Sequence, residues 1–320
     1  MTLTAVVAVG GNALAREGEE GSYRQQRQNA RSVAGAIVGL VDAGYRVAVT
    51  HGNGPQVGRL ALQQERAVDI VPPEPLFVLG AMTQGHIGHV LASALRDAIG
   101  ERPIEPVAVV THVVVDAGDG AFARPTKPIG PFFSRTQAHE LAERYGWQVA
   151  DDAHRGYRRM VPSPEPLAIV EGRAVRLLVE AGFLVIASGG GGIPTLKAEG
   201  GTLTGVDAVV DKDLAAARLA TAIGAGLLVL ATAVDRVLIG FGTPRAAPVD
   251  QLSGDEAESF LRQGQFAAGS MAPKVEAAAR FVREGGELAI ITSPEHVLAA
   301  VRGEHGTRVV PGRAVRASGW

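Results

Sequence analysis

The sequence contains no cysteine, which excludes disulfide bonds, thiolate metal sites and a cysteine nucleophile. No stretch approaches the roughly 18 apolar residues of a membrane span, and no charged segment followed by a long apolar run opens the chain. The net charge of −2 offers no basic footprint for nucleic acid. These absences predict a cytoplasmic protein that binds neither membranes nor nucleic acid.

Two common nucleotide-binding loops are missing as well. The dipeptide Gly-Lys never occurs, so the chain has no GxxxxGK[ST] phosphate loop. No GxGxxG follows the first apolar run, which argues against a dinucleotide-binding fold. A phosphate site in this chain must therefore be built in another way.

Lysine is scarce too. Of 31 basic residues only Lys127, Lys197, Lys212 and Lys274 are lysines, and the others are arginines. A position that keeps lysine in such a chain can need a compact ammonium group instead of a planar guanidinium. Three of the four lie in unusual glycine- or proline-rich contexts, which favours a functional role over chance. Lys197, in a polar hairpin-like segment, is predicted to lie on the surface.

Short apolar runs alternate with helical patterns along most of the chain. With 320 residues, 46% of them hydrophobic, the chain can bury one large core or two ordinary ones. The alternation predicts an α/β fold with an open, mostly parallel sheet sandwiched by helices. Strands are predicted at Thr4–Val9, 46–50, 107–115, 183–187, 226–231 and 287–292, and helices at 22–43, 56–67, 77–98, 166–181, 212–223, 253–263, 273–284 and 294–302.

Three glycine loops follow predicted strands. They are Gly10-Gly11-Asn12, Gly52-Asn53-Gly54 and the four glycines from Gly189 to Gly192. Bare backbone N–H groups in such loops can wrap an anion, although tight strand-to-helix turns are the alternative, and the better one for Gly54. Since ligands bind beyond the carboxyl ends of parallel strands, we expect the loops to share one edge of the sheet.

Two of the lysines sit at predicted helix starts. Lys212 lies between Asp211 and Asp213, so one aspartate can cap the helix while the other orients the lysine. Lys274 follows Ser270, which is predicted to be the N-cap, and a first-turn proline. A cation at a helix start is unfavourable unless an anion lies nearby. Simple helix capping with an exposed lysine is the alternative for Lys212.

Residues 116–165 break the alternation, with prolines and an irregular course. A long irregular segment in a compact domain is usually functional, so we predict an inserted subdomain or lid that carries Lys127. A solvated loop lysine is the equal alternative. His86 and His89 have a metal-compatible spacing, but no other ligand cluster accompanies them, so packing or solvent is favoured and no protein metal site is predicted.

Phosphoryl transfer requires positioning and positive charge around the oxygens that gain charge, and little covalent help. Two lysines, glycine-loop amides and a metal ion could supply both. The inventory of this chain therefore points to phosphate chemistry.

Several stretches resemble carbamate kinases, in the amino acid kinase superfamily. The resemblance runs in order over about residues 4–310. It rests on VVAVGGNAL, VTHGNGPQVGRLALQQ, AMTQGHIGH, RPTKPIGPFF, RRMVPSPEP, SGGGGIP, VDAVVDKDLAA and FAAGSMAPKVEAA.

This resemblance implies a homodimeric cytoplasmic enzyme that interconverts ATP plus carbamate with ADP plus carbamoyl phosphate, uses Mg²⁺ with the nucleotide, and takes part in arginine catabolism. It implies an acceptor lobe over 1–185 that includes a protruding subdomain at about 117–165. A nucleotide lobe over 186–310 and a polar tail over 311–320 follow.

Site residues carried over by position fall into three groups. Lys212 and Lys274 would flank the transferring phosphoryl group, held by Asp213. Carbamate and phosphoryl oxygens would contact Gly10, Gly11, Asn12, Gly52, Asn53 and, from the lid, Lys127. The nucleotide would contact Gly189, Gly190, Gly191, Asp211, Thr232, Val234, Asp235, Phe241, Ser270 and Met271.

The chain also departs from its relatives. Most of the superfamily has a lysine where this chain has Ala8; carbamate kinases share the lack, and Lys212 is thought to supply the missing charge. Ala233, Arg236 and Phe241 replace residues more common in the family on the nucleotide side. Two alternatives follow: a family enzyme acting on another small carboxylate or phosphate, or a non-catalytic nucleotide-binding regulator.

Overall fold

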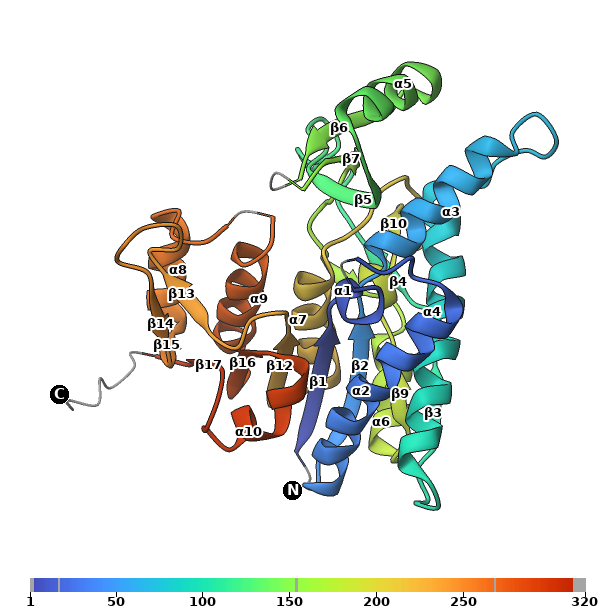
Figure 1. Ribbon diagram of the computed structural model, residues 1–320. Coiled ribbons are helices and arrows are strands. Elements are labelled where there is room, and N and C mark those ends of the chain that lie inside the picture. Colours follow the sequence, from blue (N-terminus) through green and yellow to red (C-terminus); the bar gives the residue numbers. More distant parts are fainter. Residues whose placement is uncertain (1–2, 17, 153–154, 268, 313–320) are drawn as a thin grey trace.

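The computed structural model describes residues 3–16, 18–152, 155–267 and 269–312 (Figure 1). Apart from its first two residues, the predicted tail 311–320 lies outside the described residues. Within the described ranges, no helix combines the length and the apolar character that crossing a membrane requires.

An eight-stranded sheet forms the centre of the molecule, in the order β15-β17-β16-β12-β1-β2-β9-β3. Every neighbouring pair is parallel except β16 and β17, which confirms the predicted open, mostly parallel sheet. The strands are β1 (Thr4–Val9), β2 (Arg46–His51), β3 (Pro106–Ala108), β9 (Leu184–Ile186), β12 (Leu227–Ala231), β15 (Gln251–Ser253), β16 (Leu288–Thr292) and β17 (Thr307–Val310).

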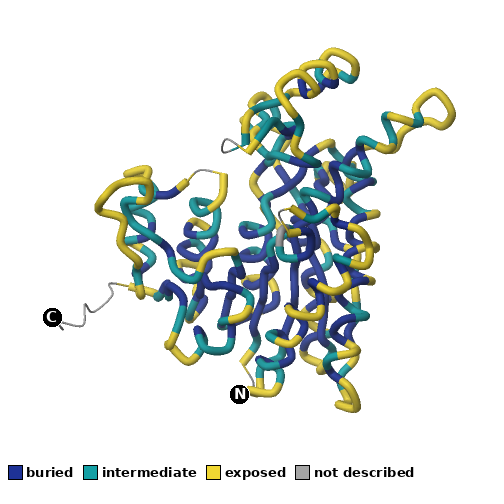
Figure 2. Tube along the Cα trace, in the orientation of Figure 1, coloured by how far each residue is buried: buried dark blue, intermediate teal, exposed yellow. Residues whose placement is uncertain are grey.

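Helices cover both faces of this sheet, because its central strands are apolar on both sides. On β1, Ala5 and Val7 belong to one hydrophobic cluster, whereas Val6 and Ala8 belong to the other. The Ala5 side packs against α2 (Tyr23–Asp42), α4 (Leu76–Ile99) and α10 (Val297–Val301), the last preceded by η2 (Pro294–His296). The Ala8 side packs against α6 (Gly172–Glu180), α7 (Lys212–Ile223), α8 (Gly254–Arg262) and α9 (Ala272–Arg283). Figure 2 shows the buried strands between these layers.

A second, four-stranded sheet corrects one strand prediction. The predicted strand 107–115 is two strands in different sheets, β3 and β4 (His112–Val114), separated at Thr111. Gln84 of α4 accepts a hydrogen bond from the Thr111 backbone N–H at 2.9 Å and donates to its carbonyl at 3.0 Å. The Thr111 carbonyl also accepts from the Ile193 N–H at the start of β10 at 2.9 Å, so at this residue the chain has already turned from the main sheet to the second one. The second sheet has the order β11-β10-β4-β8, with β8 (Ala168–Ile169), β10 (Ile193–Lys197) and β11 (Leu203–Gly205).

Two helix predictions are also corrected. The predicted helix 166–181 begins only at Gly172, because Ala168–Ile169 pairs with β4 as a strand. Ser270 was predicted to be the N-cap of α9, but the N-cap is Met271, one residue later. Ser270 is exposed in the turn before the helix.

A small layer stands above the main sheet, shown in green in Figure 1. It consists of a three-stranded antiparallel sheet in the order β5-β7-β6 and of α5 (Arg135–Tyr145). Its strands are β5 (Lys127–Phe133), β6 (Gln148–Asp151) and β7 (Tyr157–Val161), and β13 (Val237–Ile239) with β14 (Ala247–Val249) form a separate hairpin. The predicted domain boundaries stay a prediction; the one between 185 and 186 falls within β9.

Candidate functional site

Three charged side chains meet beyond the carboxyl edge of the main sheet. Lys212 Nζ lies 2.5 Å from Asp213 Oδ1, and Lys274 Nζ lies 2.8 Å from Asp213 Oδ2. The Asp213 side chain is 3% exposed and the two lysines 11% and 12%. A single buried carboxylate therefore holds two ammonium groups, one from the start of α7 and one from the start of α9.

The aspartate on the other side of Lys212 has a different role. Asp211 is the N-cap of α7, and its Oδ1 accepts from the Asp213 N–H at 2.8 Å. Its Oδ2 forms an ion pair with Lys127 Nζ. The expected division of labour is confirmed: one aspartate caps and the other holds the lysines. In addition, β5 of the protruding layer is tied to the start of α7.

Burial and charge shift the pKa values of these groups. Burial lowers the pKa of Lys212 to about 8, against the attraction of Asp213 and together with the repulsion of Lys274. Burial also acts to lower the pKa of Lys274, but the attraction of Asp213 outweighs burial, so the pKa of Lys274 is raised. The pKa of Asp213 is lowered, because the two lysines overcome the effect of burial. The cluster thus keeps an ionised carboxylate at neutral pH, with Lys212 as the ammonium group closest to titration.

The three glycine loops pack against one another at this edge, as predicted. A Cβ at Gly52 would lie 2.7 Å from the backbone N of Gly11 and 3.1 Å from Lys212 Cδ. A Cβ at Gly190 would lie 2.2 Å from Asn53 Nδ2. Since real Cβ atoms do not come so close, only glycine allows the loops after β1, β2 and β9 to converge beside Lys212. Gly10 is the N-cap of α1 (Gly11–Leu14), and the side chain of Asn12, in that helix, lies outside what the structure describes.

The quadruple-glycine turn is strained at its entry. Ser188 has φ 53° and ψ 31°, a left-handed conformation that costs free energy for a residue with a side chain. Its backbone is fixed on both sides, with its N–H donating to Thr111 Oγ1 and its carbonyl accepting from Thr50 Oγ1. Gly190, Gly191 and Gly192 continue with positive φ, which turns the backbone sharply at the site.

One residue of this region was not among the predicted site residues. His51 ends β2 directly before the second glycine loop and is 1% exposed. A Cβ at Gly189 would lie 2.3 Å from its Nε2, so the imidazole supports the quadruple-glycine turn. Burial lowers the pKa of His51 to about 4, and it is neutral at physiological pH. Its position at the end of an apolar run, beside glycines, was the available signal.

Uncapped helix starts lie at the same edge. Among the described residues, no side chain caps α9 or α3 (Gly54–Arg66), whereas α2, α5 and α8 each begin with a capping box. The free N–H groups and the helix dipole at such a start attract an anion. Lys274, in the first turn of α9, adds a full positive charge there.

The residues predicted for the nucleotide come from several places. Gly189, Gly190, Gly191 and Asp211 lie in the loops described above, Thr232, Val234 and Asp235 follow β12, Phe241 follows β13, and Ser270 and Met271 directly precede α9. Thr232, directly after β12, donates its backbone N–H to the Thr292 carbonyl at 2.8 Å. The carboxylate oxygens of Asp235 lie 2.9 Å from His296 Nδ1 and 3.2 Å from His305 Nδ1. Val234, Phe241 and Ser270 are exposed, and Met271 packs partly against the core. Among the described residues, those predicted for the nucleotide are therefore not joined in one hydrogen-bonded cluster like that of Asp213.

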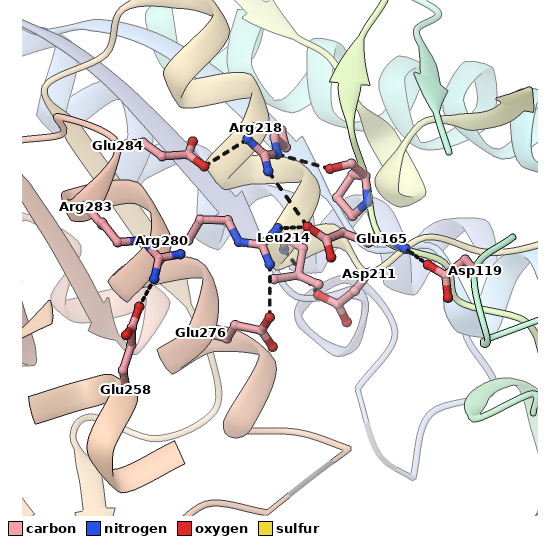
Figure 3. A network of polar contacts seen from close by, with 11 residues as sticks. Asp119, Glu165, Asp211, Leu214, Arg218, Glu258, Glu276, Arg280, Arg283 and Glu284 are labelled. Atoms are coloured by element: carbon pink, nitrogen blue, oxygen red, sulfur yellow. Dashed lines mark hydrogen bonds and ion pairs between the residues drawn. The ribbon is translucent and has the colours of Figure 1, made fainter. Parts of the chain in front are cut away.

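An ionic network holds the segment after β7, where the chain leaves the protruding layer, against α7 and α9 (Figure 3). Glu165, just after β7, accepts from Arg280 of α9 at 2.6 Å and lies 3.8 Å from Arg218 of α7. The Glu165 backbone N–H donates to Asp119 Oδ2 at 2.8 Å. The two chain segments that enter and leave the protruding layer are thereby tied to each other and to the two helices that carry the lysines.

Comparisons with known proteins agree with this geometry. The profile of the amino acid kinase family matches residues 4–293. A carbamate kinase of Pyrococcus horikoshii is 44% identical over 310 residues, which cover 96% of this chain and 98% of that protein.

Solved structures extend the likeness to three dimensions. Carbamate kinase from Giardia lamblia bound to citric acid matches with a TM-score of 0.91 at 38% identity, and the same enzyme bound to AMP-PNP with 0.87 at 40%. Both matches cover 97% of this chain and 99% of the other.

Proposed function

The chain belongs to the amino acid kinase family, and we infer that it is a carbamate kinase, which interconverts ATP plus carbamate with ADP plus carbamoyl phosphate. The observation that carries this inference is the cluster of Lys212, Lys274 and Asp213 among three converging glycine loops. Relatives that are carbamate kinases cover nearly the whole chain, and AMP-PNP binds to one of them.

The lysine pair supplies the charge that phosphoryl transfer needs. The oxygens of the transferring group gain negative charge in the transition state, and fixed cations in a site of low dielectric stabilise that charge. Asp213 holds both ammonium groups in place before substrates arrive, so little reorganisation is needed during the reaction. Asp213 also offsets their mutual repulsion.

Lys212 has a particular task because of Ala8 on the first strand. Ala8 is fully buried and faces the same cluster as α7, so β1 brings no charge to the site from its end. The aliphatic part of the Lys212 side chain, which extends from the start of α7, packs against Gly52, and Gly52 in turn packs against Gly11. We propose that it supplies, from the helix side, the charge that a first-strand lysine supplies in other members of the superfamily.

The acceptor fits the glycine loops by size. Carbamate is small and planar, so the backbone amides of Gly10, Gly11 and Asn53 can hold it without a side-chain pocket. The Gly52 N–H donates to the Val9 carbonyl at 2.9 Å, so Gly52 contributes by leaving space beside Gly11 and Lys212. Lys127, the first residue of β5 in the protruding layer, forms an ion pair with Asp211. We propose that this ammonium group turns to the substrate when both ligands are bound.

Mg²⁺ would enter with the nucleotide in this proposal. Both oxygens of Asp213 bind lysines, and those of Asp211 bind Lys127 and backbone N–H groups. These carboxylates are thus already engaged, which fits an ion held mainly by phosphate oxygens and water. When bound, Mg²⁺ neutralises phosphate charge, while the lysines of this chain act on the transferring group.

The transfer would be direct. A carbamate oxygen attacks the γ-phosphorus of ATP as the bond to the ADP oxygen breaks, in line, and no phosphoenzyme forms. The reverse reaction uses the same contacts. A function in arginine catabolism, in the cytoplasm, belongs to the same proposal.

A homodimer is the proposed assembly. β8 is an edge strand of the second sheet, flanked by Leu167 and Val170, which are 47% and 42% exposed. Exposed apolar side chains along an open strand edge favour association with another chain. Sedimentation velocity at several concentrations tests this, and a monomer throughout would reject it.

The decisive experiment mixes the protein with ADP, Mg²⁺ and carbamoyl phosphate and follows ATP. We expect ATP at rates far above the non-enzymatic background. The same assay with acetyl phosphate tests the alternative acceptor. No ATP from carbamoyl phosphate would remove the leading function, and ATP from acetyl phosphate alone would replace it.

A further inference from the structure

Outside the lysine cluster, two histidines and an aspartate converge on the other side of the same edge. Asp235 lies in the turn between β12 and β13, His296 closes η2 after β16, and His305 lies just before β17. Among the residues that the structure describes, these three form the group of acidic and imidazole ligands close enough to hold one metal ion.

The geometry is compact. His296 Nδ1 lies 2.9 Å from Asp235 Oδ1, and His305 Nδ1 lies 3.2 Å from Asp235 Oδ2. All three ligand atoms lie within 4.8 Å of one another. Ligands at about 2.0–2.1 Å from a tetrahedral ion are separated by roughly 3.3 Å, which is close to the spacings of these ligand atoms.

The arrangement of the two rings also shows what must move when an ion binds. The two imidazole rings are stacked, with centroids 4.1 Å apart and planes at 14°. A ring nitrogen binds a metal ion in the plane of its ring, so one of the two stacked rings has to rotate about its Cβ–Cγ bond before both nitrogens can face the same ion. The Thr292 hydroxyl, 3.5 Å from Asp235 Oδ1, helps to orient the carboxylate from outside the ligand set.

We propose that Asp235, His296 and His305 bind one divalent transition-metal ion of the Zn²⁺ or Co²⁺ class, separate from the Mg²⁺ that accompanies the nucleotide. Two imidazoles and one carboxylate suit these ions and not Mg²⁺, which prefers oxygen ligands. Each side chain is about two-fifths exposed, so the ion can enter from solvent and the fourth ligand position is open to water.

Such an ion would join parts of the chain that are far apart in sequence. It would link the turn after β12, which carries Thr232 and Val234, to the segment between β16 and β17. That turn belongs to the predicted nucleotide side of the site. The bound ion would therefore restrain the turn after β12 against the segment between β16 and β17.

The test uses full-length protein without a histidine tag, treated with EDTA and then titrated with Co²⁺ in the absence of nucleotide. We expect one Co²⁺ per chain, with the visible absorption of a low-coordinate site, and displacement by Zn²⁺ but not by excess Mg²⁺. The variants His296→Ala and His305→Ala should each weaken binding by more than the roughly 10- to 100-fold that loss of an outer-shell partner causes.

His86→Ala and His89→Ala are the matched controls. Both histidines are exposed on α4, three residues apart, and should leave Co²⁺ binding unchanged. Each variant is compared with its own thermal melt in EDTA, and added Co²⁺ should raise the melting temperature of the wild type and of the α4 variants but not of the His296 and His305 variants. No stoichiometric Co²⁺ in the wild type, wild-type affinity in those two variants, or loss of binding in the α4 variants would each overturn the proposal. Because no nucleotide or turnover is involved, failure here is independent of the phosphotransferase assay.

Discussion

At the scale of single residues, the two buried lysines decide whether the proposed chemistry holds. Lys212→Ala and Lys274→Ala each remove one fixed cation from the transferring phosphoryl group. Loss of one preorganised electrostatic contact costs about 10²–10³ in turnover, and we expect each variant to fall at least that far. The measurement is ATP formed from ADP and carbamoyl phosphate, with circular dichroism to verify the fold.

Lys197→Ala is the control for these substitutions. This lysine is exposed at the end of β10, away from the buried cluster, and its loss should leave turnover unchanged. Near-normal activity in both Lys212→Ala and Lys274→Ala would exclude the proposed mechanism.

The lowered pKa of Lys212 predicts a dependence on pH. Above about pH 8 the free enzyme loses this ammonium group, so kcat/KM for ADP should fall there. Bound phosphates favour the charged form, so the decline in kcat should begin at higher pH. In Lys212→Arg, whose guanidinium stays charged, the decline near pH 8 should disappear even if the rate is lower. An unchanged decline in that variant would assign it to another group.

The same pKa has a consequence for stability with a defined sign. The folded pKa of about 8 lies below the ordinary value of 10.5, so between these pH values the unfolded chain binds more protons than the folded chain. The contribution of Lys212 to the free energy of unfolding therefore rises as pH rises through this window. Lys212→Met should flatten that part of the profile in denaturant titrations, whereas Lys197→Met should not.

Sequence reasoning located much of this site because its signals are local. The aspartates flank Lys212 directly, and each glycine loop follows an apolar run. The ion pair of Lys127 with Asp211, and the support of Gly189 by His51, join residues far apart in the chain, so no local pattern contains them. At Ser270 a local signal was present but the prediction from it was wrong. The backbone N–H groups of Ser270, Met271 and Ala272 bond to the Ala267 carbonyl in a preceding turn, and α9 begins only after Met271.

At the scale of elements, the position of the lid depends on a contact between two glycines. A Cβ on Gly58 of α3 would lie 2.1 Å from Gly130 Cα and N on β5, a backbone that cannot rotate away. Gly58→Ala should therefore push β5 away from α3 and disturb the ion pair of Lys127, at the start of β5, with Asp211. We expect a loss of roughly 1–3 kcal/mol in stability and up to about 100-fold in kcat/KM.

Gly85→Ala provides the comparison. It lies in α4 with open space around its would-be Cβ, and alanine there should stabilise the helix by up to about 1 kcal/mol. Denaturant melts and initial rates measure both variants. Equal kcat/KM for Gly58→Ala and the wild type would show that the α3–β5 contact does not position Lys127.

The split of the predicted strand 107–115 has the same kind of cause. Its β-branched run has the local pattern of a single buried strand, and that pattern is correct on both sides of Thr111. Beyond Val109 the backbone no longer pairs with β9, and Thr111 bonds instead to Gln84, 27 residues earlier, and to Ile193 of β10. Strand composition predicts that residues are extended, whereas the sheet they join depends on partners the local sequence does not contain.

At the scale of the whole molecule, one sheet runs through both predicted lobes. β1, from the predicted acceptor lobe, pairs with β12, from the predicted nucleotide lobe, in register from Ala5 with Leu227 to Val9 with Ala231. Both strands are buried on both faces. The lysine of α7, the lysine of α9 and the glycine loops after β1 and β2 are therefore held by one continuous sheet with a hydrophobic cluster on each face.

This continuity predicts that the lobes do not unfold separately. Differential scanning calorimetry of the ligand-free protein should show one main transition, because separating the lobes would expose the β1–β12 edge and its apolar faces together. For the same reason, a fragment of residues 186–310 should lack a cooperative melt, since β12 would lose its partner β1. Two resolved transitions, with one reproduced by that fragment, would mean that the halves of the site are carried by independent units and that ATP and carbamate are brought together by their motion.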